Sequence, residues 1–149
     1  FDCFRTKAYI AGKCVEDLDG SKFEVLNPVD DSVIAEVANC GSKETEQAIT
    51  AAHDSLIPWS TKPAKEKARL MRAWFETIVA NAETLATLLT LEQGKPLAEA
   101  RTEINYGASY IEWFSEETKR IYGDVIPAPG ADKRILTINR FNTDGRICY

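Results

Sequence analysis

Residues 90–126 read TLEQGKPLAEARTEINYGASYIEWFSEETKRIYGDVI, and this stretch decides how the chain folds. Gly94 suits the left-handed backbone position just past a helix end. Pro96 suits the first turn of the following helix, where its missing N–H is not needed. We therefore predict one helix that ends near Gly94 and a long helix that runs from Pro96 to Tyr122.

The predicted long helix has two apolar faces. One face follows the helical period and carries Leu97, Ala100, Ile104, Ala108, Ile111, Ser115, Thr118 and Ile121. The other is an aromatic stripe of Tyr106, Tyr110 and Trp113 at spacing i, i+4 and i+7. A helix that is apolar on two sides is usually packed between other elements, so core packing is the first interpretation of the stripe. The alternative is a substrate tunnel, where large rings with polar tips shape a pocket.

Strand patterns occupy residues 7–38. Ala8-Tyr9-Ile10 and Cys14-Val15 flank Ala11-Gly12, a pair typical of a short hairpin turn. Two further strands are predicted for residues 22–26 and 32–37, and the residues between them have turn chemistry.

Residues 42–122 are predicted to be helical. Ser42 is expected to cap a helix that continues to about Leu56 and is ended by residues 57–59, which include a proline. A second helix is expected from about Pro63, and Asn81 is expected to cap a third.

The C-terminal part is predicted to be a loop at residues 127–133 and one final strand from Arg134 to Arg140. The expected fold class is therefore α+β, with N-terminal β-hairpins, a layer of four helices and one C-terminal strand.

Composition excludes several classes of function. The 149 residues carry a net charge of -5, which offers no basic surface for nucleic acid or anionic lipid. No stretch approaches the roughly 18 apolar residues of a membrane span, and residues 1–19 have no signal-peptide pattern. We predict a cytoplasmic protein. Since the chain begins with Phe1, a few upstream residues are expected to be missing.

Cysteine and histidine usage excludes a zinc site built from closely spaced ligand pairs. Cys3, Cys14, Cys40 and Cys148 are scattered, and His53 is the single histidine. The number of cysteines alone does not decide whether the chain forms disulfides. His53 falls on a predicted amphipathic helix, so we expect a helix-surface or packing role for it.

Several motifs appear in an order that resembles the N-terminal part of aldehyde dehydrogenases, nearest to the succinate-semialdehyde branch. The resemblance covers about Lys7 to Ile138, and Ala11 and Cys14 depart from it, since Asn and Trp are usual there. The motifs are residues 9–13 (YIAGK), Asn27-Pro28, Ala51-Ala52, residues 69–75, residues 92–96 and residues 109–127.

This resemblance implies an activity for the complete protein. A complete relative would oxidise a short semialdehyde, of succinate or glutarate type, to the carboxylic acid with NAD(P)+, and would be a homo-oligomer. A cysteine thiolate adds to the carbonyl, hydride leaves to the nicotinamide, and water hydrolyses the thioester. The family's catalytic Cys, Glu and Asn are expected beyond residue 149. No catalytic or cofactor-binding residue is therefore predicted here, and the chain is expected to form an incomplete part of the family's α/β fold.

The resemblance also implies two sites. Tyr106, Ser109, Tyr110 and Trp113 would lie on one wall of the substrate channel. Glu92, together with the backbone carbonyls of Val25 and Leu26, would help to hold a monovalent cation, because hard cations take oxygen ligands. The alternative for Glu92 is a solvated carboxylate at a helix end, and we favour it over the cation.

The last residues differ from the family. Residues 1–140 are predicted to be the N-terminal segment of an aldehyde dehydrogenase domain, and residues 141–149 (FNTDGRICY) an out-of-family tail. One back-translation of residues 142–149, read in a shifted frame, gives IPMGVFV, which resembles the apolar Gly-Val strand expected next. We therefore predict a frameshift near Arg140, and we do not interpret Cys148 as a nucleophile.

Three expectations follow for the isolated chain. It should not oxidise succinate semialdehyde, it should not bind NAD(P)+, and it should self-associate. A non-catalytic interaction module retained from the family is the alternative. The sequence leaves open which semialdehyde and which nicotinamide nucleotide the complete protein would use.

Overall fold

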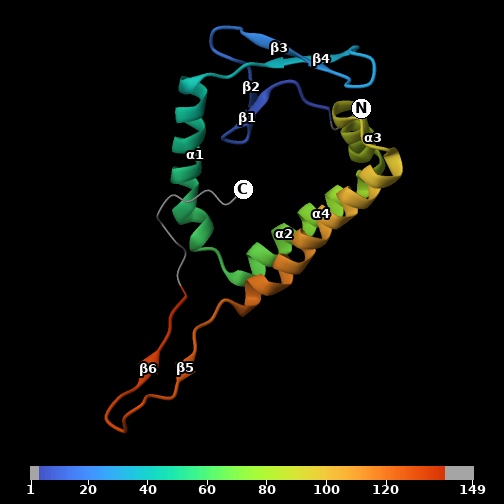
Figure 1. Cartoon of the computed structure of the whole chain (residues 1–149). Coiled ribbons are helices and arrows are strands. Elements are labelled where there is room, and N and C mark those ends of the chain that lie inside the picture. Colours follow the sequence, from blue (N-terminus) through green and yellow to red (C-terminus); the bar gives the residue numbers. More distant parts are fainter. Residues whose placement is uncertain (1–3, 140–149) are drawn as a thin grey trace.

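The computed structural model describes residues 4–139, and it has four helices and three two-stranded antiparallel sheets in that range (Figure 1). In chain order the elements are β1 (Ala8–Ile10), β2 (Lys13–Val15), β3 (Lys22–Leu26), β4 (Val33–Ala38), α1 (Ser42–Ser60), α2 (Ala64–Ala80), α3 (Ala82–Gln93), α4 (Leu97–Glu117), a 3₁₀ turn (Thr118–Arg120), β5 (Val125–Ile126) and β6 (Ile135–Leu136). The mixed helix and strand content agrees with the predicted class.

The two N-terminal hairpins form where the sequence predicts them. The β1–β2 turn places both Ala11 and Gly12 in the left-handed region, with φ of 51° and 80°, as a two-residue hairpin of this kind requires. In the second hairpin Lys22 faces Ala38 and Leu26 faces Val33, with an irregularity between Val25 and Leu26.

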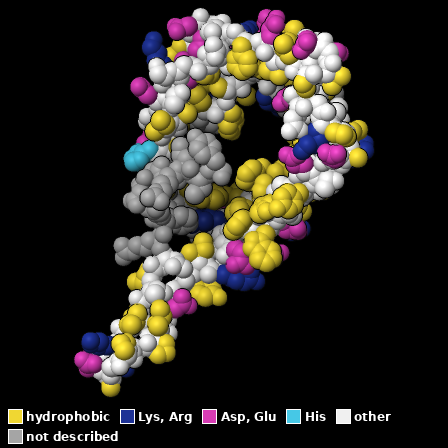
Figure 2. Space-filling model, viewed as in Figure 1, with side chains coloured by type: hydrophobic (Ala, Val, Ile, Leu, Met, Phe, Trp, Pro, Cys, Tyr) yellow, Lys and Arg dark blue, Asp and Glu magenta, His cyan; other side chains and the backbone are white. Residues whose placement is uncertain are grey.

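The helices do not form the single layer of four that we expected. In Figure 1, α4 runs back alongside α2 and also packs on α3, whereas α1 stands apart and packs against β1. Figure 2 shows the molecule open in the middle, with hydrophobic side chains around the opening and on α4. The helices α2, α3 and α4 therefore form the packed helical part of the described chain.

The ends of two helices differ from the prediction. The first helix continues through Pro58 to Ser60 and does not end at Leu56, because a proline in the last turn removes only one helical hydrogen bond. Asn81 is the N-cap residue of α3, as predicted. Its side chain makes no cap hydrogen bond to α3, and its side-chain Nδ2 donates instead to the carbonyl oxygen of Thr77 at 2.8 Å.

The N-terminus of α1 is held by a hydrogen bond to the side chain of Glu44, and not to that of Ser42. Gly41 is the cap residue, and its N–H donates to the Glu44 carboxylate at 2.8 Å. The N–H of Leu18, on the connection after β2, donates to the same carboxylate at 3.2 Å. The residue is 4% exposed, so one buried carboxylate joins the first hairpin to α1.

The pKa of Glu44 is lowered from its ordinary value of 4.5, chiefly by its own backbone N–H and further by those of Gly41 and Leu18, against an opposing effect of burial. A carboxyl group with a depressed folded-state pKa stabilises the fold above its unfolded pKa, and this stability is lost as the pH falls through the folded pKa. We expect Glu44→Gln to lower the thermal unfolding midpoint by several degrees at pH 7, with a difference that shrinks below pH 4.5. Circular dichroism melts between pH 7 and pH 3 measure this. Glu46→Gln, an exposed carboxylate of the same helix, is the control, and an equal effect of both variants would contradict the assignment.

Small side chains fill the contact between α4 and its neighbours. The predicted buried face of α4 is confirmed at Ala100, Ala108 and Ser115, which are 0%, 2% and 3% exposed. Ile121 was predicted on this face but is exposed, because α4 ends at Glu117 and gives way to a 3₁₀ turn. No large side chain among residues 4–139 is fully buried, so the core of the described chain is thin.

Ala108→Leu tests this close packing. Three extra carbon atoms at a site that is 2% exposed force neighbouring side chains apart, and we expect a loss of about 1–3 kcal/mol of stability. The matched control is Ala98→Leu, which adds the same atoms on the exposed side of the same helix and should change stability by less than about 0.5 kcal/mol. Urea titration of both variants measures the difference, and equal midpoints would contradict the packing.

The C-terminal strand predicted at residues 134–140 is a two-residue strand within a hairpin. In β6, Ile135 pairs with Ile126 and Leu136 with Val125, so residues that we had not assigned to a strand form β5. The hairpin projects from the helices in Figure 1 and leaves most of its apolar side chains in solvent. Arg140 and the predicted tail at 141–149 lie outside the described residues.

Candidate functional site

The turn before α4 sets the position of the candidate site. Gly94 has φ of 77°, and its N–H donates to the carbonyl oxygen of Thr90 at 2.8 Å, which closes α3 in the predicted left-handed cap. A Cβ atom at Gly94 would lie 3.1 Å from Cγ of Pro28, in the turn after β3. Glycine is therefore required for both the backbone conformation and the close approach of the β3–β4 turn.

The aromatic stripe of α4 lies on the surface, so the core-packing interpretation is wrong for the described residues. Tyr106 and Trp113 are 62% and 65% exposed. A pocket of about 660 Å³ brings together the four residues predicted for the channel wall with three further residues of the same helix. It is lined by Tyr106, Ser109, Tyr110, Glu112, Trp113, Phe114 and Glu116.

Tyr106 and Tyr110 form a hydroxyl pair in this pocket. Their oxygens are 2.5 Å apart, and their rings meet edge to face with centroids separated by 5.0 Å. This hydrogen bond raises the pKa of Tyr110, so the phenol stays neutral and keeps its proton. One of the two hydroxyls donates its hydrogen to the other, and neither hydroxyl has another hydrogen-bond partner within residues 4–139. The pair therefore retains one O–H that can donate into the pocket.

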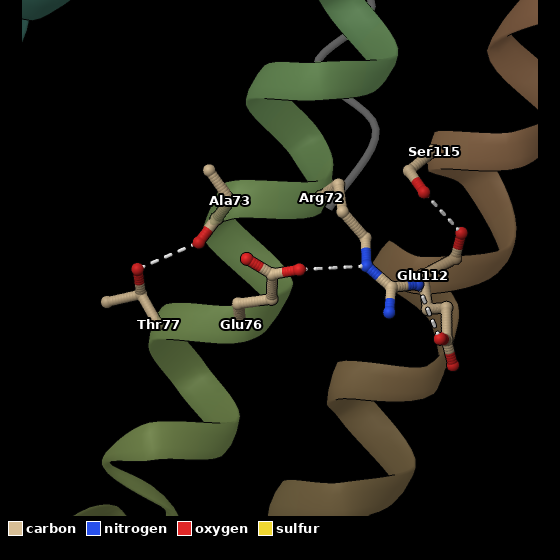
Figure 3. Close-up of polar contacts among 6 residues, drawn as sticks. All are labelled: Arg72, Ala73, Glu76, Thr77, Glu112 and Ser115. Atoms are coloured by element: carbon tan, nitrogen blue, oxygen red, sulfur yellow. Dashed lines mark hydrogen bonds and ion pairs between the residues drawn. The ribbon is translucent and has the colours of Figure 1, made fainter.

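Arg72 of α2 holds the flank of α4 next to this pocket (Figure 3). Its Nη1 donates to Oε1 of Glu112 at 2.7 Å, and its Nε donates to Oε1 of Glu76 at 3.2 Å. The guanidinium carbon lies 4.8 Å from the centroid of the Phe75 ring. Hydrogen bonds to Glu76 and Glu112 raise the pKa of Arg72 further above its ordinary value. The hydroxyl of Ser115 donates to the carbonyl oxygen of Glu112 at 2.7 Å.

The ion pair between Arg72 and Glu112 was not predicted from the sequence. Arg72 and Glu76 have the i, i+4 spacing of a helical ion pair, and this was a readable signal. Glu112 lies 40 residues from Arg72 in the sequence, and only the packing of α4 on α2 brings the two together. No local pattern could have found that contact.

The predicted cation ligands lie on β3 and at the end of α3. Val25 is half-buried in the β3–β4 hairpin, and Glu92 is exposed in the last turn of α3. Within residues 4–139, no three His, Cys, Asp or Glu side chains converge as a metal site would require. The predicted set differs in kind, since it has one carboxylate and the carbonyls of Val25 and Leu26, and it stays a prediction.

At the start of α1, a side chain already takes the place that an anion would occupy. The Glu44 carboxylate accepts the Gly41 N–H there. The starts of α2, α3 and α4 have no side-chain cap hydrogen bond. These features do not test nucleotide binding, so the expectation that the segment does not bind NAD(P)+ stays a prediction.

Comparison with known proteins identifies the family. Residues 15–140 match the aldehyde dehydrogenase family. The chain belongs to this family. The succinate semialdehyde dehydrogenase of Acinetobacter baylyi is 49% identical over 133 residues, which cover 89% of this chain and 28% of that protein. The glutarate-semialdehyde dehydrogenase of Pseudomonas putida is 48% identical over 137 residues, which cover 92% and 28%.

The chain also resembles a solved structure over most of its length. An Escherichia coli NADP-dependent enzyme is 47% identical and superposes with a TM-score of 0.85, covering 91% of this chain and 28% of that one. The chain thus spans about 28% of the length of the curated relatives it matches. Among residues 4–139, no helix is long and apolar enough to cross a membrane.

Proposed function

We propose that this aldehyde dehydrogenase chain is the N-terminal segment of an NAD(P)-dependent semialdehyde dehydrogenase of succinate or glutarate type. The observation that carries the proposal is the exposed aromatic pocket of α4, in a chain 48–49% identical to two such enzymes. An apolar pocket left open on a packed helix is the form that a substrate-channel wall would take.

The chemical role of the segment would be to hold and orient the aldehyde. The rings of Tyr106, Tyr110 and Trp113 would exclude water from the carbon chain of the substrate, and the tyrosine pair would supply a hydrogen-bond donor. Nicotinamide chemistry, when the nucleotide is bound, would oxidise the aldehyde. We propose that this segment makes no contact with the nucleotide, because its sequence carries no glycine-rich phosphate-binding run.

The remaining features of the proposal concern the complete protein. We infer a cytoplasmic homo-oligomer that acts on a small-molecule semialdehyde and contacts neither nucleic acid nor membrane, in keeping with the acidic composition. For Glu92 we favour a solvated carboxylate at the end of α3, and a monovalent cation held together with the carbonyls of Val25 and Leu26 is the alternative.

A hybrid enzyme tests the proposed function. In it, residues 7–138 of this chain replace the matching N-terminal segment of the Acinetobacter baylyi succinate semialdehyde dehydrogenase. We expect the hybrid to oxidise succinate semialdehyde with a kcat/KM within about tenfold of its parent, a difference of roughly 1.4 kcal/mol in transition-state stabilisation. NAD(P)H formation at 340 nm measures this. A folded hybrid with no activity on any aldehyde would reject the proposal.

Within the hybrid, Trp113→Ala should lower kcat/KM for the semialdehyde by roughly tenfold, because about 1.5–3 kcal/mol attends the burial of a large apolar side chain. The matched control is Trp74→Ala, which removes an exposed tryptophan of α2 that does not line the pocket. We expect less than a twofold change for it. Equal losses in both variants would show that the aromatic pocket has no special part in substrate binding.

A further inference from the structure

A carboxylate lies on the wall of the α4 pocket that we propose for the aldehyde. Glu112 lines the pocket together with Tyr110 and Trp113, and its side chain is 40% exposed. An ionised carboxylate in that position would repel any ligand that carries a negative charge. The semialdehydes named for the relatives carry a carboxylate, so the pocket needs a means to offset Glu112.

Arg72 supplies that means from another helix. Its guanidinium binds the Glu112 carboxylate at 2.7 Å while its Nε is held by Glu76, as Figure 3 shows. The contact of the guanidinium with the Phe75 ring fixes it from a third side. Arg72 therefore orients Glu112 and offsets part of its charge, since one guanidinium is shared between the carboxylates of Glu112 and Glu76.

The position of Glu112 makes its charge relevant to a bound substrate. Glu112 lines the pocket, so a ligand there would lie nearer to its carboxylate than the Debye length of about 8 Å at physiological ionic strength. Salt would therefore screen this interaction only in part. Glu116 also lines the pocket, and it borders the groove that carries Arg69 and Lys119. Without Arg72, both Glu112 and Glu116 would face the ligand, and the charge of Glu112 would no longer be offset.

We propose that Arg72 is a specificity-determining positioning residue: by orienting Glu112 from α2 and offsetting its charge, it allows the α4 pocket to accept aldehydes that carry a carboxylate. This inference rests on the proposed function, since it concerns the substrate of the same pocket. Arg72 acts through Glu112 and does not touch the reacting atoms. Its removal should therefore disfavour anionic aldehydes and leave uncharged ones unaffected.

The test compares two substrates in the hybrid enzyme. Succinate semialdehyde is anionic, and butanal is an uncharged aldehyde of the same chain length. We expect Arg72→Gln to lower kcat/KM for succinate semialdehyde by about three- to tenfold, mainly through KM, and for butanal by less than about twofold. The double variant Arg72→Gln/Glu112→Gln should restore the semialdehyde value, and the defect of the single variant should shrink as salt is added.

Arg101→Gln is the matched control. Arg101 also joins two helices, through bonds of 2.8 and 2.6 Å to Glu83 of α3, but neither residue lines the pocket. We expect it to affect both substrates equally. Equal effects of Arg72→Gln on both substrates, or no restoration by the double variant, would overturn the inference alone. A hybrid that is inactive on every aldehyde would overturn the proposed function and this inference with it.

Discussion

The purified 149-residue chain is expected to self-associate and to bind dyes that report exposed apolar surface. Among residues 4–139, Trp74, Trp113, Phe114 and the β5–β6 hairpin lie largely in solvent, and no large side chain in this range is fully buried. Each large apolar side chain left unburied forgoes about 1.5–3 kcal/mol, whereas a whole domain is stable by only about 5–15 kcal/mol. The short hairpin also has open strand edges, which can pair with another chain.

Size-exclusion chromatography with light scattering, together with dye fluorescence, measures this expectation. Trp113→Glu should reduce both the apparent mass and the dye signal, because a charge interrupts the exposed aromatic stripe. Glu99→Gln, a change on the exposed surface of the same helix that adds no apolar area, serves as the control. A compact monomer with a sharp thermal transition and no dye binding would contradict the expectation, and it would favour a free-standing interaction module.

The second large effect concerns catalysis. Purified by itself, the polypeptide of residues 1–149 should not reduce NAD(P)+ with succinate semialdehyde, and its activity should fall short of the hybrid enzyme by at least about 10⁴-fold. Losses of this order accompany removal of a covalent nucleophile and its base. The eight glycines of the chain are dispersed and form no phosphate-cradling run, so we expect no micromolar binding of either nucleotide by calorimetry.

The described cysteines support this expectation. A thiolate is the nucleophile in covalent aldehyde oxidation. Burial raises the pKa of Cys40, and the negative charges of Glu44 and Asp17 raise it further, so this thiol is kept protonated. Cys14 is exposed on the first hairpin, and His53 is exposed on α1, where it has no hydrogen-bond partner among the described residues. Cys3 and Cys148 lie outside the described residues.

An activity assay at 340 nm with semialdehyde and each nucleotide checks the prediction. The Acinetobacter baylyi enzyme, expressed and purified in the same host, is the positive control. A Cys14→Ser/Cys40→Ser variant distinguishes the chain from contaminating host dehydrogenases, since contamination would survive the substitution. Turnover that depended on either cysteine would contradict the prediction.

The sequence by itself determined the local elements and the family. The Ala11-Gly12 turn, the Gly94 cap and the start of α4 at Pro96 follow from short-range backbone preferences, so residue type alone fixes them. The small-residue face of α4 was also readable, since helical periodicity places Ala100, Ala108 and Ser115 on one side. The predicted ends of α1 and α4 were less accurate, because a proline near the helix end or a final 3₁₀ turn changes few hydrogen bonds.

The tertiary structure decided which faces of α4 are covered and which charges meet. Periodicity showed two apolar faces, and the packing of α2 and α3 buried only the one with small side chains. The aromatic stripe is open because no element of the described residues covers that side of α4. The Arg72–Glu112 bond, and the Glu44 bond to Leu18, join residues 40 and 26 positions apart. Contacts at these separations depend on how helices and hairpins dock, which no local sequence pattern specifies.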